Sequence, residues 1–171
     1  ALFPYTTLFR SDIDLLLSEA PIQIYSSHID KINHLLKYST PYPVYNLALE
    51  YMIERFCFEL NSLNKKGVLI LESRGRKEDK FVLDKLLNLF EKGNRYCKPQ
   101  QFECIIGVYF NPKRTGDNMK SYWPLELADL YSYSIHKFIK ESKKDPLFSH
   151  FEEKIKGYPD YNGKGIKLFP S

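Results

Sequence analysis

Two carboxylates in the sequence stand where acid chemistry is expected, and Glu72 is the first. It directly follows Gly67–Leu71, the continuous apolar run GVLIL, which is typical of a strand buried on both faces of a helix-covered sheet. Ligands of α/β proteins bind beyond the carboxyl ends of the strands, so a carboxylate there is well placed to act. The alternative is that Glu72 only marks the emergence of the strand into solvent, paired with Arg74 two residues later.

Asp129 is the second carboxylate, and it lies within the segment PLELADLYSYSIH at residues 124–136. Small and apolar residues flank it. A carboxylate in such surroundings is either paired or bound to a metal, because an isolated buried charge is costly. The alternative is an exposed aspartate near the start of a helix, where the helix macrodipole favours a negative charge.

Hydrophobic periodicity predicts the elements that would position these acids. The expected strands cover residues 22–29, 67–73 and 102–110, and the expected helices cover residues 12–20, 44–63, 78–92, 124–140 and 146–155. Strands that alternate with helices are typical of an α/β layered fold with parallel crossovers. We therefore expect strands 67–73 and 102–110 to be adjacent and parallel.

The composition is that of an ordinary globular chain, with 43% hydrophobic and 27% charged residues in 171. A formal net charge of +4 is too small to indicate nucleic acid by itself, although it does not oppose a polyanionic substrate. No apolar run approaches the roughly 20 residues of a membrane helix, so no membrane association is expected. The three cysteines form no metal-ligand spacing, and an odd count without an export signal predicts a reducing, cytoplasmic setting.

Three segments together resemble one known family. They are LESRGRKED at residues 71–79, PLELADLYSYSIHKF at residues 124–138 and GIKLFP at residues 165–170. This combination resembles the family catalogued as domain of unknown function 3800, which is similar to ribonuclease H-like proteins. SSHIDK at residues 26–31 is a weaker match to the same family. The resemblance spans residues 22–170.

The resemblance implies a ribonuclease H-like three-layer fold and a metal-dependent nuclease. Its catalytic acids would be an aspartate on the first strand, Glu72 and Asp129, which would hold two divalent metals, with Mg²⁺ as the expected ion. Arg74 and Lys120 are the expected phosphate-binding residues. The alternative is a non-catalytic module of the same fold that binds nucleic acid or a partner protein.

The start of the chain is expected to be foreign to the fold. Leu2 to Ser11 can be written as the codons of a common sequencing-library adapter, so we interpret residues 1–11 as an artefact. The motif Asp-Glu-Ser that begins members of the family does not occur here. We therefore expect residues 12–171 to be the C-terminal part of a single domain that is N-terminally truncated, with its first strands missing, and we expect this fragment to be inactive.

Overall fold

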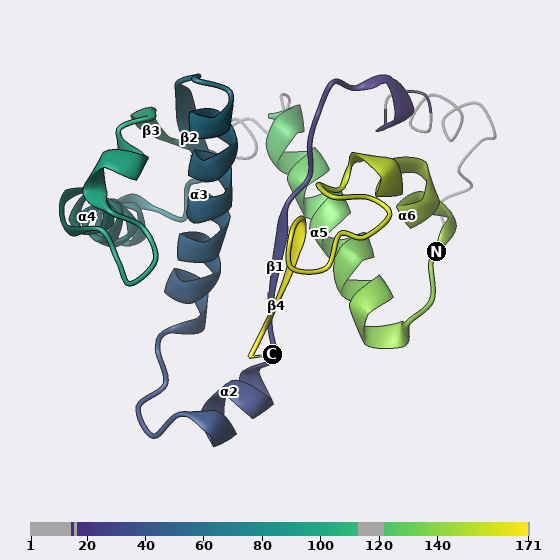
Figure 1. Ribbon diagram of the computed structural model, residues 1–171, viewed down its shortest axis with the longest axis horizontal. Coiled ribbons are helices and arrows are strands. Elements are labelled where there is room, and N and C mark those ends of the chain that lie inside the picture. Colours follow the sequence, from purple (N-terminus) through teal and green to yellow (C-terminus); the bar gives the residue numbers. More distant parts are fainter. Residues whose placement is uncertain (1–14, 16, 113–121, 171) are drawn as a thin grey trace. The chain divides into compact units, whose positions relative to one another are not determined.

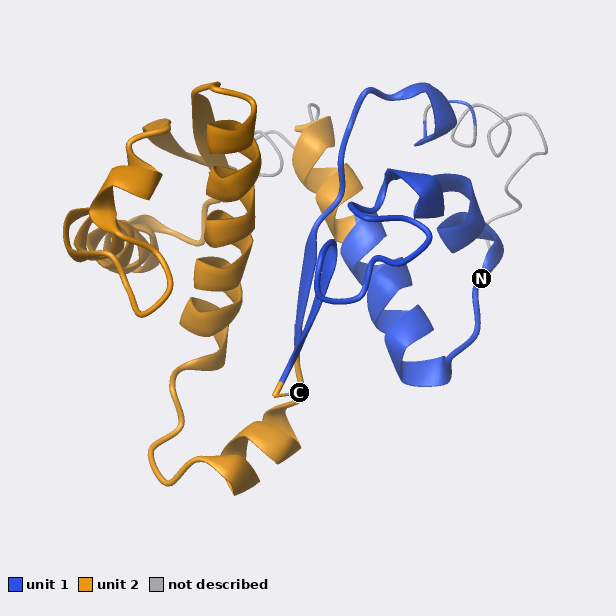
Figure 2. Ribbon diagram, viewed as in Figure 1, with its two compact units in different colours: residues 1–28, 130–169, 171 blue, residues 29–129, 170 orange. Residues whose placement is uncertain are grey.

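The computed structural model describes residue 15, residues 17–112 and residues 122–170. The adapter-like residues 1–11 and Lys120 lie outside the described residues, so the predictions for them stay predictions. Two compact units divide the chain (Figure 2). Unit 1 contains residues up to 28 together with 130–169, and unit 2 contains residues 29–129.

Strands and helices follow one another along the chain, which confirms a mixed α/β class (Figure 1). The strands are β1 (Ser26–Ile29), β2 (Gly67–Glu72), β3 (Ile105–Asn111) and β4 (Ile166–Phe169). The α-helices are α2 (Lys31–Lys37), α3 (Val44–Ser62), α4 (Arg76–Lys92), α5 (Trp123–Glu141) and α6 (Pro146–Phe151), with short 3-10 helices at Pro99–Phe102 and Glu152–Lys154. Leu15 and residues 17–19 are also helical. Among the described helices, none is both long and apolar enough to cross a membrane.

Two short elements are not predicted by the sequence patterns, α2 and β4. Helix α2 begins after Asp30, whose carboxylate accepts hydrogen bonds of 3.0 Å from the backbone N–H groups of Ile32 and Asn33. This is ordinary N-cap chemistry, but seven residues are too few for a helical period to be recognised. Strand β4 has four residues and pairs with β1 in a two-stranded sheet of its own.

Strands β2 and β3 form a parallel pair, which confirms the expected adjacency and direction. The register runs from Val68 opposite Gly107 to Glu72 opposite Asn111. Because Gly67 pairs with Ile105, the intervening Ile106 is an extra residue and the pair contains a β-bulge at its start. The carboxyl ends of both strands therefore lie together, with Glu72 and Asn111 side by side.

The expectation that these strands are buried on both faces is wrong. Alternate side chains are open to solvent: Val68 and Ile70 are each 39% exposed, Tyr109 is 57% exposed and the bulged Ile106 is 67% exposed. The physical reason is that α3 and α4 both pack against the opposite face of the pair, through Leu69, Leu71, Val108 and Phe110. An apolar run shows that a strand is hydrophobic, but it does not show which faces are covered.

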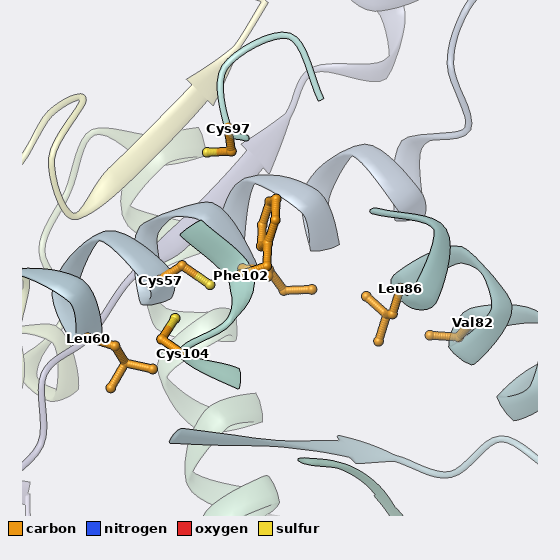
Figure 3. Close-up of a cluster of buried hydrophobic side chains, with 8 residues drawn as sticks. Cys57, Leu60, Val82, Leu86, Cys97, Phe102 and Cys104 are labelled. Carbon is orange, nitrogen blue, oxygen red and sulfur yellow. The ribbon is translucent and has the colours of Figure 1, made fainter. Parts of the chain in front are cut away.

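A buried hydrophobic cluster joins α3 and α4 to the segment before β3 (Figure 3). Its buried members are Ile53, Cys57, Leu60, Val82, Leu86, Cys97, Phe102 and Cys104. Each large apolar side chain that is fully buried here contributes about 1.5–3 kcal/mol. Cys57 and Cys104 turn their sulfur atoms toward one another, and burial, followed by the hydrogen bond with Cys104, raises the pKa of the Cys57 thiol far above its ordinary value. The Cys57 thiol therefore stays protonated and serves as a packing group.

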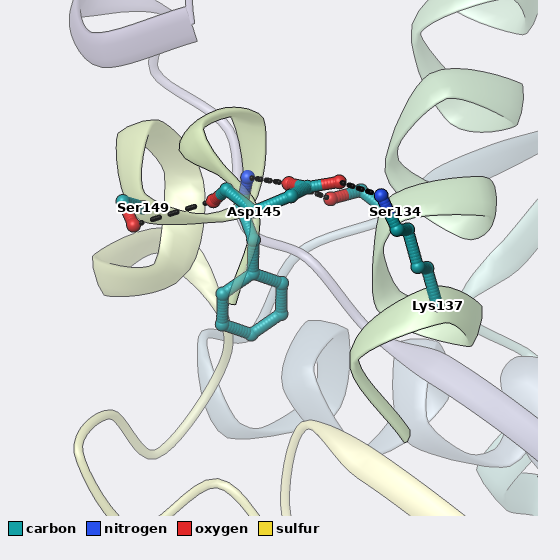
Figure 4. Close-up of polar contacts among 5 residues, drawn as sticks. Ser134, Lys137, Asp145 and Ser149 are labelled. Atoms are coloured by element: carbon teal, nitrogen blue, oxygen red, sulfur yellow. Dashed lines mark hydrogen bonds and ion pairs between the residues drawn. The ribbon is translucent and has the colours of Figure 1, made fainter. Parts of the chain in front are cut away.

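Asp145 connects α6 to α5 within unit 1 (Figure 4). Its Oδ1 accepts hydrogen bonds from the backbone N–H of Phe148 at 2.8 Å and from the Ser134 hydroxyl at 3.0 Å. Its Oδ2 lies 3.9 Å from Nζ of Lys137. The ring of Phe138 stacks on that of Phe148 with centroids 4.4 Å apart. The carboxylate thus begins α6 and also fixes it to α5.

Candidate functional site

Glu72 is the last residue of β2, as the sequence predicts. Its side chain is exposed, and the register places Asn111 of β3 directly opposite it. Paired residues of parallel strands project from the same face, and neighbouring strands lie about 4.8 Å apart. The carboxylate and the amide therefore stand next to each other at the carboxyl edge of the sheet, on its solvent-exposed face.

The loop after β2 is held by Asp79, in the first turn of α4. Its Oδ1 accepts a hydrogen bond from the backbone N–H of Arg74 at 2.8 Å, and its Oδ2 accepts one from the Ser73 hydroxyl at 2.5 Å. Gly75 has φ +108°, a backbone conformation that side chains disfavour, and lets the chain turn into the helix. The loop that carries Arg74 is therefore fixed from both sides.

Arg74 does not pair with Glu72, which answers the alternative left open by the sequence. Its guanidinium lies over the ring of Tyr45, 4.6 Å from the centroid, in a cation–π contact with α3. Among the described residues, Glu72 has no ion-pair partner. The carboxylate and the guanidinium thus remain available to different parts of a ligand.

Asp129 lies in the second turn of α5 and is exposed, so it is not a buried charge. The helix runs from unit 2 into unit 1, because the division of the chain falls between Asp129 and Leu130. The approach of Asp129 to Glu72 stays a prediction. Lys120, the second expected phosphate ligand, lies outside the described residues.

Oxygen donors dominate the end of the β2–β3 pair. Within the described residues, no three His, Cys, Asp or Glu side chains gather closely enough to hold a metal ion. The Glu72 carboxylate and the Asn111 side-chain carbonyl are ligands of the type that Mg²⁺ accepts while it keeps several waters. A metal held there would need another oxygen ligand from the protein, and Asp129 is the one that the resemblance implies.

Sequence reasoning missed Asn111 and left open whether Asp79 has a role. The signal for Asn111 was its place directly after the apolar run of β3, but the strand was expected to end one residue earlier. Asp79 belongs to the segment LESRGRKED that resembles the family, but an acid near the start of a helix is explained equally well by the helix macrodipole. Its bonds to the preceding loop depend on the φ of Gly75, which composition does not reveal.

No family model, no curated protein and no solved structure matches this chain. The family resemblance therefore depends on the sequence segments alone.

Proposed function

We propose that this chain belongs to a metal-dependent nuclease with a ribonuclease H-like layout, which hydrolyses phosphodiester bonds. One observation carries the proposal: Glu72 stands exposed at the carboxyl end of a parallel strand, beside Asn111 and without an ion-pair partner among the described residues. Ligands of open α/β sheets bind at that edge. An exposed acid and an amide at this edge are suited to ligand binding.

Glu72, Asn111 and Asp129 would supply the oxygen ligands for Mg²⁺. When bound, the metal would lower the pKa of a water and stabilise the leaving oxygen of a phosphodiester. The residues of this chain would orient that water and hold the phosphate in one position. The donor set fits the ion, because it consists of carboxylate and carbonyl oxygens at a solvent-exposed edge.

Arg74 would contact the phosphate of the substrate. Its backbone N–H is held by Asp79 and its guanidinium rests on Tyr45, so the side chain is ordered before a ligand arrives. An ordered guanidinium loses little conformational entropy on binding, and its planar fork matches two phosphate oxygens. Lys120 is proposed as a second cationic contact from the loop before α5.

Cleavage of a fluorescent oligonucleotide tests the proposal, with RNA and DNA versions assayed in Mg²⁺ and in EDTA. Because the resemblance implies a third aspartate on a preceding strand, the assay uses a chain extended by that strand. Glu72→Gln and Asp129→Asn should each reduce the rate at least about a hundredfold, since each keeps the shape and removes one charge from the metal ligands. The free energy of unfolding should change by less than about 0.5 kcal/mol in either variant, because both side chains are exposed.

The matched controls are Glu103→Gln and Glu141→Gln, which remove exposed acids elsewhere in unit 2 and at the end of α5. They should cleave at the parental rate. Equal cleavage by the parent, both site variants and both controls would refute the nuclease assignment.

A second candidate is a non-catalytic module of the same layout that binds nucleic acid or a partner protein. The exposed apolar face of the β2–β3 pair favours it, because Tyr109 and Ile106 offer surfaces on which bases or apolar side chains could pack. Oligonucleotide binding that is unaffected by Glu72→Gln, in the absence of any cleavage, would favour this candidate.

A further inference from the structure

A pocket of about 200 Å³ lies between α3 and α4, closed at one end by the turn at Gly93 and Asn94. All of its lining belongs to unit 2. It is distinct from the end of β2, because its lining comes from the first two turns of α3 and from α4 between Val82 and Leu89. It is smaller than the roughly 300–1,000 Å³ of pockets for drug-sized ligands, so its size selects a compact molecule.

One wall of the pocket is apolar. Val82, Leu86 and Leu89 of α4 line it, and Leu86 and Val82 also belong to the buried cluster of unit 2. These side chains are fixed by the core behind them. The wall is therefore a preformed surface for a short aliphatic chain.

The other wall carries negative charge. Glu50 and Glu54 stand one turn apart on α3, and both accept a hydrogen bond from the side-chain nitrogen of Asn94, at 2.5 Å each. Glu54 is only 5% exposed, whereas Glu50 is half-buried and lines the pocket. Two carboxylates held against one amide repel each other, and a cation placed beside them would relieve that repulsion.

The orientation of Asn94 is determined by its own backbone contacts. Its Oδ1 accepts hydrogen bonds from the backbone N–H groups of Tyr96 at 2.9 Å and Cys97 at 2.7 Å, so its Nδ2 must face the glutamates. The preceding Gly93 has φ +69°, and a Cβ there would lie 2.4 Å from the carbonyl oxygen of Cys97. The amide has two hydrogens and each glutamate uses one. Glu50 therefore retains acceptor capacity toward the pocket.

The two glutamates also act on neighbouring groups of unit 2. Burial, followed by the charges of Glu54 and Glu50, raises the pKa of the Cys97 thiol to about 11. Burial, followed by the charge of Glu54, likewise raises the pKa of Tyr51 to about 12. Lys85 also lines the pocket, but its ammonium lies over the ring of Phe81, 5.6 Å from the centroid, and no ion pair with Glu50 forms among the described residues.

From this geometry we propose that the pocket between α3 and α4 binds a compact organic cation, a primary ammonium on a short aliphatic chain. The ammonium donates to the free lone pairs of Glu50, and the methylene groups pack on the leucines of the opposite wall. Asn46, one turn before Glu50 on α3, adds an amide oxygen to the same side of the pocket. The site is independent of the proposed nuclease function.

Titration of the full chain with n-butylamine hydrochloride, n-butanol and sodium butyrate, followed by two-dimensional NMR, tests this proposal. At neutral pH, n-butylammonium should shift the side-chain amide signal of Asn94 saturably, with a dissociation constant on the order of millimolar. Butanol should bind about tenfold more weakly, because it lacks the charge. Butyrate should not bind, because the carboxylates repel it.

Two variants test whether charge in the pocket determines the affinity for n-butylammonium. Glu50→Gln should weaken n-butylammonium binding about tenfold, since glutamine still accepts the bond from Asn94 but carries no charge. Lys85→Met should strengthen it a few-fold, because an exposed like charge is removed from the rim while the stem of the side chain is kept. Glu103→Gln, an exposed acid outside the pocket, should leave the affinity unchanged.

Butanol and butylammonium binding with equal affinity, or unchanged affinity in Lys85→Met and Glu50→Gln, would overturn the proposal. So would the absence of a saturable shift at millimolar concentrations. Because Lys85 is exposed and outside the core, its variant tests the proposal even if Glu50→Gln does not fold.

Discussion

Asp79 and Asn111 show how single residues complete the surroundings of Glu72. Asn111 adds an oxygen donor through strand register, and Asp79 fixes the loop that carries Arg74 through two hydrogen bonds. Neither role can be inferred from residue type alone. The place of Glu72 could be predicted, because an acid directly after an apolar run marks the end of a strand wherever the strand lies in the sheet.

Cys97 supports a prediction at the same scale, on the pH dependence of stability. Burial and the nearby glutamates raise its pKa from 9.0 to about 11, so the folded chain keeps this proton where the unfolded chain has lost it. The associated stability is complete below pH 9 and is lost as the pH rises toward 11. Between these two pH values, the free energy of unfolding of Cys97→Ala should therefore fall less steeply than that of the parent. The two slopes should differ by at most about 1.4 kcal/mol per pH unit.

Urea unfolding at pH 8 and at pH 10.5 measures this slope for the parent and the variant. Tyr51 and Cys57 are present in both proteins, so the difference between the slopes reports the replacement of Cys97. Identical slopes would show that the fold does not hold this thiol in its protonated form.

The long elements follow from periodicity, whereas the coverage of the sheet does not. Helices α3, α4 and α5 and strands β2 and β3 all lie close to the residues expected for them, because each has a sustained apolar pattern. The exposed face of β2–β3 could not be predicted, since it depends on α3 and α4 both choosing one side. The elements α2 and β4 escaped notice because they are short, and the partner of β4 is distant in sequence.

Asp145 offers a test of how one element is attached to another. Asp145→Ala removes the N-cap of α6, the bond to the buried Ser134 hydroxyl and the contact with Lys137. We expect a loss of about 2 kcal/mol in the free energy of unfolding, because a cap is worth about 1 kcal/mol and a buried hydroxyl loses its partner.

Urea unfolding of this variant is compared with that of Asp160→Ala. The pair between Asp160 and Lys164 is exposed on both sides, so its loss should cost less than about 0.5 kcal/mol. Equal losses in the two variants would mean that Asp145 does not hold α6 in place.

At the scale of the whole molecule, unit 1 is built from two segments that are distant in sequence. Unit 1 combines an early segment with residues 130–169, and α5 crosses the division between the units directly after Asp129. The sequence predicted that Glu72 and Asp129 share a site only through the family resemblance. Periodicity could not have done so, because it describes each helix and strand separately and contains no information about which ends meet.

Paramagnetic broadening by Mn²⁺ tests the shared site most directly, since the ion broadens NMR signals only of nuclei close to it. In the chain as it stands, substoichiometric Mn²⁺ should broaden the backbone amide signals of Glu72, Asn111 and Asp129 together, and EDTA should restore them. Glu72→Gln should abolish the broadening at Asp129 as well as at its own position, while Glu141→Gln should leave it unchanged. Broadening of Asp129 that persists in Glu72→Gln, or broadening spread evenly over exposed acids, would contradict a common metal site.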